Sequence, residues 1–359
     1  MDVFDRIGAD DYEQVVFCHD RGSGLRAIVA IHSTRLGPAL GGTRFYPYAS
    51  EDEGLEDVLR LARGMTYKAA AAGLDLGGGK AVIFGDPTRD KTEALLRAYA
   101  RYVDALGGRY LTAEDVGTTQ DDMDLVRKET RFVTGVSREL GGSGDPSEAT
   151  AYGVLWAMKA VAVHLWGDAS LSGRHVALAG VGKVGRALLG HLVAEQARVT
   201  VADVSPATVE RAVTEAGVEA VAVEKVHAVD CDIYAPCALG GVLNADTIPE
   251  LRCAVVVGSA NNQLADGTAS ARQLADAGVL YAPDFVTNAG GILNIAEELG
   301  PRGYNQDRAQ AAVRRIFDTV TSVLQAAEED GVTTAAAADR LAEGRIAALS
   351  AVHQIRAPT

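Results

Sequence analysis

The order of apolar and polar positions divides the chain into two parts with different periodicities. In the first 45 residues, YEQVVFCHD and RAIVAIHST alternate apolar and polar side chains, which predicts half-buried strands. Residues 55–69 then carry apolar side chains three and four positions apart behind an acidic start at 51–53, which predicts an amphipathic helix. The glycines at 77–79 predict a turn, residues 91–106 a helix, and RYLTAED a further strand.

From about residue 150, short and almost wholly apolar segments alternate with stretches long enough for helices. Strands that are apolar on both faces are typical of a parallel sheet covered by helices on each side. We therefore expect a doubly wound α/β domain here. Its strands are expected at HVALAG, RVTVAD, CDIYAP, CAVVVG and VLYAP.

A polar, glycine-rich segment at residues 135–150 is the best candidate for a linker between the two parts. The sequence therefore predicts an α/β protein of two domains, residues 1–145 and 146–331. A helix is expected to end near Gly331, and a last helix at about 332–359 is expected to pack back on the first domain.

Composition and charge narrow the kind of partner. Of 359 residues, 48% are hydrophobic and 23% are charged, which is typical of a globular protein. The net charge of −14 repels polyanions, so we expect no nucleic-acid or membrane partner and favour a small molecule. The apolar runs are too short for a membrane span, and the acidic N-terminus lacks the features of a secretory signal. The four scattered cysteines are expected to be reduced thiols in a cytoplasmic protein, with no metal site.

A glycine-rich turn after the strand HVALAG predicts a dinucleotide site. Gly180, Gly182 and Gly185 follow the pattern G-x-G-x-x-G, and Val184 begins the apolar stripe of a helix. Glycines allow the backbone to approach a pyrophosphate, and the helix N-terminus offers N–H donors. Asp203 ends RVTVAD, 18 residues after Gly185, where its carboxylate can bind both ribose hydroxyls and repel a 2′-phosphate. NAD is favoured over NADP; the alternative is a glycine turn that binds nothing.

Two lysines and an aspartate in the first part are candidates for chemistry. Lys68 ends the first predicted helix at the edge of its apolar stripe, and Lys80 stands between three glycines and the apolar AVIF strand, where it is partly desolvated. Asp115 follows in LTAEDVGT. The segment is not a phosphate loop, because Leu74 and Ala81 stand where that loop needs glycine and a hydroxyl. Taken singly, each lysine is also explained as a solvated surface charge.

Several long motifs, spread over nearly the whole chain, resemble the amino-acid dehydrogenases of the glutamate, leucine, phenylalanine and valine superfamily. They are GGTRFYPYAS, GMTYKAAAAGLDLGGGKAVI, LTAEDVGT, GVGKVG, APCALGGVLN, GSANNQLAD and YAPDFVTNAGGILN. The resemblance implies a substrate and oligomerisation domain, then a Rossmann NAD domain, with a cleft between them and assembly as a homo-oligomer. It also implies that Lys68 binds the substrate α-carboxylate, Lys80 activates water, and Asp115 shuttles protons.

These residue types suit oxidative deamination. The reaction removes a hydride from Cα of a neutral amine, adds water to the resulting iminium, and expels ammonia. A second ammonium and a partly dry site favour a neutral amine, so Lys80 can act as a base, whereas Lys68 stays charged against a carboxylate. Asp115 can carry protons between the substrate nitrogen and solvent, which a fixed cation cannot.

The resemblance implies further contacts. The backbone at Gly41 and Gly42 is expected to contact the substrate, as is Asn262, while Asn261 is expected beside the cofactor; a plain turn remains the alternative at both pairs. The expected cofactor-binding residues are Gly180, Gly182, Lys183, Val184, Gly185, Asp203, Ala260 and Asn261.

By the same resemblance, the pocket for the substrate side chain is lined by Leu40, Ala113, Ile292 and Ile295, unless these residues serve only as core. An apolar lining disfavours glutamate, because its buried distal carboxylate would be unpaired at a cost of several kcal/mol. The branched residues favour valine, leucine or isoleucine over phenylalanine, and those three differ by at most one methylene. The resulting hypothesis is NAD-dependent oxidative deamination of branched-chain L-amino acids to 2-oxo acids and ammonia. An aromatic amino-acid dehydrogenase and a non-catalytic NAD-binding protein are the alternatives.

Overall fold

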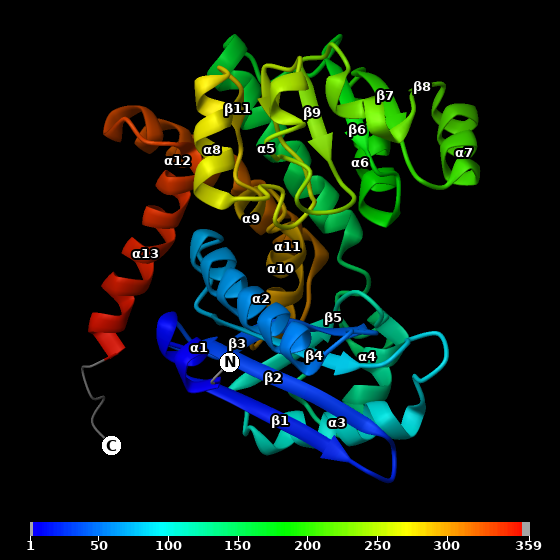
Figure 1. Ribbon diagram of the computed structural model, residues 1–359, viewed down its shortest axis with the longest axis vertical. Coiled ribbons are helices and arrows are strands. Elements are labelled where there is room, and N and C mark those ends of the chain that lie inside the picture. Colours follow the sequence, from blue (N-terminus) through cyan, green and yellow to red (C-terminus); the bar gives the residue numbers. More distant parts are fainter. Residues whose placement is uncertain (1–2, 354–359) are drawn as a thin grey trace. The chain divides into compact units, whose positions relative to one another are not determined.

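The computed structural model describes residues 3–353, which divide into two compact units (Figure 1). The first unit contains the chain up to Asp145, Ile295–Gln306, and the chain from Ala342 onward; the second contains Pro146–Asn294 and Asp307–Leu341. The segment Ile295–Gln306, which the sequence assigned to the second domain, thus belongs to the first unit. The last helix is divided between the units instead of belonging to the first alone.

The first unit is built on a mixed sheet of five strands in the order β1-β2-β4-β3-β5. The hairpin of β1 and β2 is antiparallel and confirms the strands expected from the alternating pattern, while β3 runs parallel to both β4 and β5. The strands are β1 Gln14–Asp20, β2 Leu25–Ser33, β3 Ala39–Tyr46, β4 Gly77–Phe84 and β5 Tyr110–Glu114.

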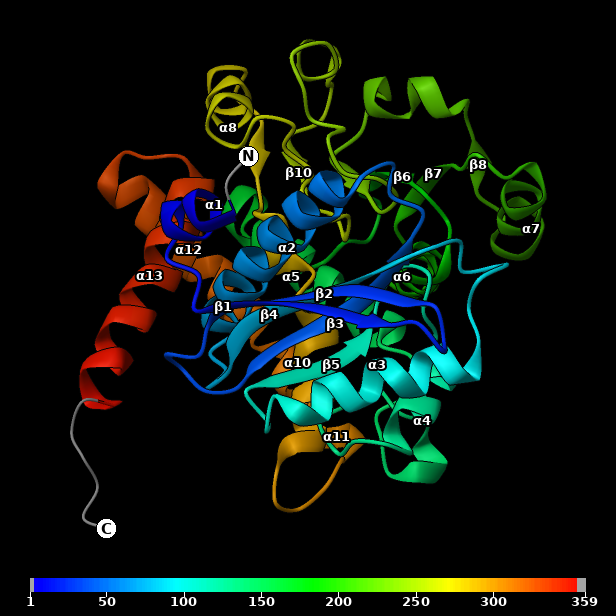
Figure 2. The same ribbon diagram turned by 60° about the horizontal axis from the view of Figure 1, so that its bottom comes forward.

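Helices cover both faces of this sheet, with α2 on one face and α3 on the other (Figure 2). The predicted helices exist, and each begins at a hydroxyl residue: Ser50 accepts from the N–H of Glu53, and Thr92 accepts from that of Leu95. The helices of this part are α1 Val3–Ala9, α2 Glu51–Ala71, α3 Glu93–Ala105, α4 Gln120–Arg127 and the 3₁₀ helix η1 Arg138–Leu140.

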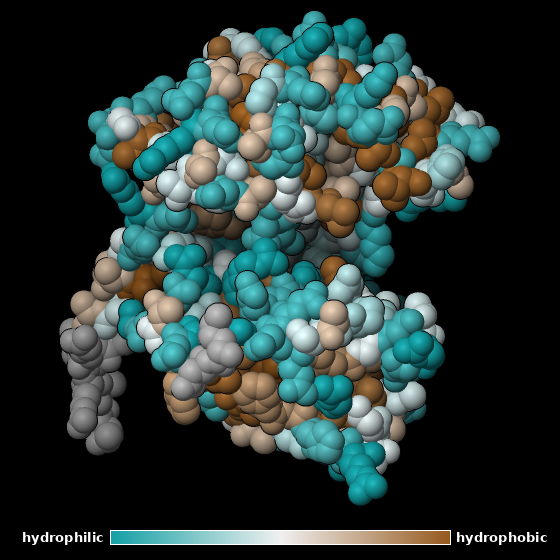
Figure 3. All heavy atoms as spheres, viewed as in Figure 1, coloured by the Kyte–Doolittle hydropathy of each residue, from teal (hydrophilic) through white to brown (hydrophobic). Residues whose placement is uncertain are grey.

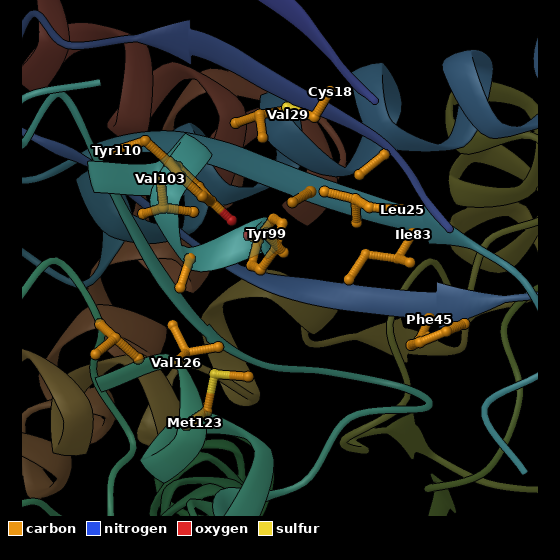
Figure 4. Close-up of a cluster of buried hydrophobic side chains, with 14 of the residues drawn as sticks. Cys18, Leu25, Val29, Phe45, Ile83, Tyr99, Val103, Tyr110, Met123 and Val126 are labelled. Carbon is orange, nitrogen blue, oxygen red and sulfur yellow. The ribbon is translucent and has the colours of Figure 1, made fainter. Parts of the chain in front are cut away.

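The core on the α3 face is almost entirely apolar (Figure 4). Tyr99 and Tyr110 are fully buried within it, together with side chains from the sheet, α3 and α4. The hydroxyl of Tyr110 donates to the carbonyl oxygen of Gly41 at 2.6 Å. A buried hydroxyl needs such a partner. This bond ties the middle of β3 to the core on the α3 face.

The prediction of a turn at residues 77–79 is wrong, because all three glycines lie inside β4. Close packing explains them. A Cβ on Gly77 would lie 1.9 Å from the carbonyl oxygen of Ser33, and one on Gly78 would lie 2.1 Å from the backbone nitrogen of Thr66 in α2. Glycine therefore lets α2 and the neighbouring strand approach β4 closely.

The second unit contains a parallel sheet of six strands in the order β11-β10-β9-β6-β7-β8. The strand order reverses next to β6, the first strand of the sheet in the chain, which is the topology of a Rossmann fold. This confirms the predicted doubly wound α/β domain. The strands are β6 His175–Ala179, β7 Arg198–Ala202, β8 Glu219–Ala220, β9 Ile233–Pro236, β10 Val255–Val256 and β11 Leu280–Tyr281.

The remaining helices follow the predicted pattern, and α12 ends with Gly331 in the left-handed conformation. They are α5 Ser147–Trp166, α6 Lys183–Ala194, α7 Pro206–Ala216, α8 Gly267–Asp276, α9 Asp284–Thr287, α10 Gly290–Ala296, α11 Gln306–Arg314, α12 Ile316–Asp330 and α13 Thr334–His353, with 3₁₀ helices η2 Val223–Ala228, η3 Ile248–Glu250 and η4 Glu297–Leu299. Among residues 3–353, no helix is long and apolar enough to cross a membrane.

Candidate active site

Two of the three candidate catalytic residues meet on one face of the first unit's sheet. Lys80 lies on β4, and Asp115 directly follows β5, with β3 between these strands. The ammonium nitrogen of Lys80 is 2.7 Å from Oδ2 of Asp115, and the two side chains are only 8% and 18% exposed. The structure therefore brings together a buried cation and a carboxylate from distant segments.

Glycine on β3 makes this ion pair possible. The register of β3 with β4 pairs Leu40 with Gly78 and Thr43 with Ala81, which places Gly42 opposite Lys80. A Cβ on Gly42 would lie 2.3 Å from the carbonyl oxygen of Glu114 and 2.9 Å from Cβ of Asp115. Since Asp115 lies over a residue without a side chain, Lys80 can reach across β3 to it.

Gly41 is equally close to its neighbours, because a Cβ there would lie 1.8 Å from the carbonyl oxygen of Gly79. Both Gly41 and Gly42 are strand residues, so the alternative of a plain turn at this pair is wrong. Their contact with a substrate stays a prediction.

Asp115 is held by its own loop as well as by cations. Its backbone N–H donates to Oγ1 of Thr118 at 2.9 Å, and that hydroxyl donates to the carbonyl oxygen of Thr43 at 2.8 Å. Burial favours the protonated carboxyl, but the charges of Lys80 and of Arg44, whose Nε is 3.3 Å from Oδ2, outweigh it. The net result lowers the pKa of Asp115 to about 2.

This lowered pKa predicts a pH-dependent contribution to stability. A carboxyl whose pKa falls from 3.8 to about 2 on folding stabilises the folded state above its unfolded pKa. The contribution, on the order of 2 kcal/mol, is lost as the pH falls through about 2. We expect the difference in unfolding free energy between the wild type and Asp115→Asn to be constant above about pH 5 and to shrink toward pH 2.

Chemical denaturation monitored by circular dichroism at a series of pH values measures this difference. Asp276→Asn, at an exposed carboxyl that ends α8, is the matched control. A wild-type to Asp115→Asn difference that stays constant down to pH 2 would contradict the assignment of Asp115 as an ionised member of the pair.

Lys68 lies in the last turn of α2 and is half-buried. It follows Thr66 by two residues, at the point where α2 packs closely on Gly78 of β4, the strand that carries Lys80. That Lys68 binds a carboxylate beside the Lys80–Asp115 pair stays a prediction.

The four residues predicted to line the side-chain pocket are all buried. Leu40 and Ala113 flank the glycine pair, on β3 and β5, and are 0% and 4% exposed. Ile295 belongs to the first unit and Ile292 to the second. Burial fits both interpretations that the sequence left open, so their role in substrate selection also stays a prediction.

The glycine turn of the second unit has the shape that a dinucleotide requires. Gly180 follows β6 with a φ of +96°, and a Cβ on Gly185 would lie 2.0 Å from the carbonyl oxygen of Gly180. Around Gly182, in contrast, a Cβ would meet nothing within 4 Å, so the N-terminus of α6 is open to a ligand. Tight glycines within the turn and an open one at its tip fit the approach of a pyrophosphate.

Asp203 lies beside this turn, directly after β7. Its Oδ2 accepts from the N–H of Val181 at 2.8 Å, and its Oδ1 accepts from that of Ser205 at 2.9 Å. Each carboxylate oxygen can accept a second bond, so the residue is held in place and can still bind ribose hydroxyls. Lys183 and Val184 begin α6 at the same turn, Lys183 exposed and Val184 half-buried.

The segment after β10 contains the asparagine pair. Asn262 is exposed and has a φ of +52°, which fits a turn-forming asparagine. Ala260 is buried, and Oδ1 of Asn261 accepts from Nδ2 of Asn288 at 2.9 Å. Asn288, which sequence reasoning missed, is 5% exposed, and its Oδ1 has no hydrogen-bond partner among the described residues. Its place in the motif TNAGG, next to the glycines, was the available signal.

Arg44 and Asp57 were also missed. Arg44 stands two residues after Gly42 in GGTRF, and in a strand this spacing puts both on one face. The motif therefore contained the signal, but only the three-dimensional structure pairs Arg44 with carboxylates.

A Rossmann sheet with an open glycine turn, joined to a unit that carries a buried lysine–aspartate pair, is the architecture of a two-domain α/β dehydrogenase. Residues 12–132 match the family described as Glu/Leu/Phe/Val dehydrogenase, dimerisation domain, and residues 141–211 and 205–353 match that described as Glutamate/Leucine/Phenylalanine/Valine dehydrogenase. The chain belongs to this family and is an amino-acid dehydrogenase, as the motifs implied.

Relatives of known name cover almost the whole chain. A leucine dehydrogenase from Bacillus cereus is 54% identical over 349 residues, covering 97% of this chain and 94% of that protein. A valine dehydrogenase from Streptomyces coelicolor is 56% identical over 340 residues, covering 94% and 92%. Among solved structures, L-tryptophan dehydrogenase from Nostoc punctiforme superposes with a TM-score of 0.83 at 42% identity, covering 97% of this chain and 99% of that one.

Proposed function

We propose that the protein catalyses the NAD-dependent, reversible oxidative deamination of branched-chain L-amino acids, namely valine, leucine and isoleucine, to 2-oxo acids and ammonia. The observation that carries the proposal is the buried Lys80–Asp115 pair over Gly42. Leucine and valine dehydrogenases as relatives at 54% and 56% identity support the substrate class.

The proposed roles follow from the position and chemistry of each side chain. Lys68 binds the substrate carboxylate, which leaves the α-nitrogen and Cα toward Lys80 and Asp115. Bound NAD supplies the acceptor for the hydride that leaves Cα. Asp115 takes the proton that the substrate ammonium gives up before the hydride leaves. Lys80 takes a proton from water as the water adds to the iminium carbon, and Asp115 returns its proton to the nitrogen that leaves as ammonia. The balance is one amino acid, one water and NAD consumed, and one oxo acid, ammonium, NADH and a proton formed.

A panel of substrates tests the substrate class. Initial rates are measured at 340 nm with saturating NAD and L-valine, L-leucine, L-isoleucine, L-phenylalanine, L-tryptophan or L-glutamate. We expect a branched-chain amino acid to have the highest kcat/KM, because Leu40 and Ala113 offer a buried carboxylate no partner. Because an L-tryptophan dehydrogenase has a similar structure, the aromatic alternative is tested with tryptophan as well as phenylalanine. A more than tenfold preference for phenylalanine or tryptophan would establish that alternative.

The choice of NAD is proposed to depend on the charge of Asp203. A carboxylate beside a 2′-phosphate costs several kcal/mol, so Asp203→Asn is expected to raise the ratio of kcat/KM with NADP to that with NAD by about tenfold or more. Asparagine keeps an acceptor for the N–H of Val181. Glu329→Gln, an exposed acid on α12, is the control. An unchanged ratio in Asp203→Asn would show that another feature selects the cofactor.

We also propose a homo-oligomer that assembles through the edge strand β1 of the first unit, the part that matches a dimerisation domain. Val15 packs in the cluster under α2, but Phe17, on the same face of β1, is 58% exposed. Figure 3 shows apolar atoms on the surface where β1 and β2 lie. An exposed edge with apolar side chains invites pairing with a second copy.

Phe17→Asp is expected to dissociate the oligomer, as measured by size-exclusion chromatography with light scattering. Val213→Asp, at a partly exposed apolar residue of α7, serves as the control and should leave the mass unchanged. A Phe17→Asp variant with the wild-type mass would contradict assembly through β1.

The four cysteines are all free thiols. This supports a location in a reducing compartment, and we propose the cytoplasm.

A further inference from the structure

The guanidinium of Arg44 lies between two carboxylates behind the Lys80–Asp115 pair. Its Nε is 3.3 Å from Oδ2 of Asp115, and its Nη1 is 2.8 Å from Oδ2 of Asp57. The side chains of Arg44 and Asp57 are 20% and 13% exposed. A fixed cation therefore touches the same carboxylate oxygen as Lys80, and it does so in a poorly hydrated place.

Three different elements contribute to this cluster. Arg44 lies on β3, two residues beyond Gly42, and so projects from the face that Lys80 crosses. Asp57 lies on α2, 11 residues before Lys68, which is a rotation of only about 20° around the helix. Arg44 thus links Asp115, through Asp57, to the side of α2 that also carries Lys68.

Asp57 is itself firmly held. Its Oδ2 accepts from the hydroxyl of Tyr48 at 2.6 Å, and its Oδ1 accepts from Nη2 of Arg60 at 2.9 Å. Burial opposes its charge, but the bond from Tyr48 and the charge of Arg44 prevail and lower the pKa of Asp57. The carboxylate of Asp57, held in place on α2, therefore fixes the Nη1 end of the Arg44 guanidinium. The Nε of Arg44 is then directed at Asp115.

We propose that Arg44 is a positioning residue for the deamination reaction: it shares Oδ2 of Asp115 with Lys80 and so keeps Asp115 in place while Lys80 gives up and regains its proton. The inference rests on the proposed function. With Lys80 alone, the two groups would form a closed ion pair, and Asp115 would lose its only cation whenever Lys80 became neutral. Arginine does not deprotonate in proteins, so its hold on Asp115 lasts through the whole cycle.

The sign of the charge makes the proposal testable. Removing a fixed positive charge makes the cluster bind its protons more tightly, whether the proton is on Lys80 or Asp115. Removing the negative charge of Asp57 has the opposite effect. The titratable or charged groups around Asp115 come from β3, β4, α2, α4 and the adjoining loops: Arg44, Lys80, Asp57, Arg60, Tyr48, and the Lys91–Asp122 pair beside Gly117.

The experiment compares pH profiles of kcat/KM for the preferred amino acid in the wild type, Arg44→Gln, Arg44→Lys and Asp57→Asn. For Arg44→Gln we expect the acid limb of the profile, where kcat/KM rises with pH, to move to higher pH by about one unit. We also expect kcat to fall by about ten- to a hundredfold with a smaller change in KM. Arg44→Lys should restore the position of the limb, because it restores the charge, and Asp57→Asn should move the limb down.

Arg101→Gln, an exposed arginine on α3, is the control, and circular dichroism with NADH binding verifies that each variant is folded. An acid limb that stays in place in folded Arg44→Gln, or that moves in the same direction in Arg44→Gln and Asp57→Asn, would overturn the proposal. If Arg44→Gln does not fold, the sign of the Asp57→Asn shift decides. A wild type inactive on all amino acids would instead reject the proposed function itself.

Discussion

Replacing Lys80 by alanine is expected to lower kcat for oxidative deamination by about a thousandfold, because general acid–base groups contribute factors of this size. Lys80 lies in the first unit, whereas the glycine turn lies in the second, so NADH should bind to the variant as it does to the wild type. Arg44 keeps a cation beside Asp115 in the variant, which limits the loss of stability. Stopped-flow measurement of NADH formation and fluorescence titration with NADH test the two halves of this expectation.

Lys128→Ala, at a lysine whose side chain is 54% exposed, is the matched control and should keep wild-type activity. If the protein were instead a non-catalytic NAD-binding protein, Lys80→Ala and Lys128→Ala would not differ in activity. Activity of Lys80→Ala within a few-fold of the wild type would therefore reject the proposed role of the lysine.

Gly42→Ala is expected to have the second large effect. The added Cβ would lie 2.3 Å from the carbonyl oxygen of Glu114 and 2.9 Å from Cβ of Asp115, so the end of β5 must move. A shift of Asp115 by even an ångström separates it from Lys80, and we expect kcat to fall by about a hundredfold. Overpacking at a buried strand should also cost about 1–3 kcal/mol of stability.

Gly344→Ala on α13 is the control, because a Cβ there meets nothing within 4 Å. Alanine is a better helix former than glycine, so this variant should unfold at the same or a higher temperature than the wild type. If Gly42→Ala kept wild-type kcat, the close approach of β5 to β3 would have no part in forming the site.

The sequence predicted the parallel sheet well, because strands buried on both faces leave a nearly continuous apolar run, as in HVALAG and RVTVAD. The prediction of a turn at residues 77–79 was wrong, because the sequence alone does not distinguish a glycine needed for close packing from one needed for a turn. The neighbours of Gly78 come from α2, which only the folded chain reveals.

The site was predictable only in part for a related reason. Lys80 and Asp115 stand in long motifs, so resemblance identified them, but their 2.7 Å contact depends on strand order and on Gly42. Arg44 and Asp57 are 13 residues apart, on a strand and a helix, and no local spacing rule joins them. The division of the last helix between units likewise depends on tertiary packing and not on helical periodicity.

The proposed mechanism is tested most directly by a crystal structure of the protein with NAD and 4-methyl-2-oxopentanoate, the oxo acid of leucine. This pair cannot react because neither molecule carries the hydride. The proposed mechanism predicts the carboxylate of the oxo acid on Lys68, its keto group within hydrogen-bond distance of Lys80, and Asp115 still paired with Lys80 or Arg44. An oxo acid bound elsewhere, or with its carboxylate away from Lys68 and its keto group out of reach of Lys80, would contradict it.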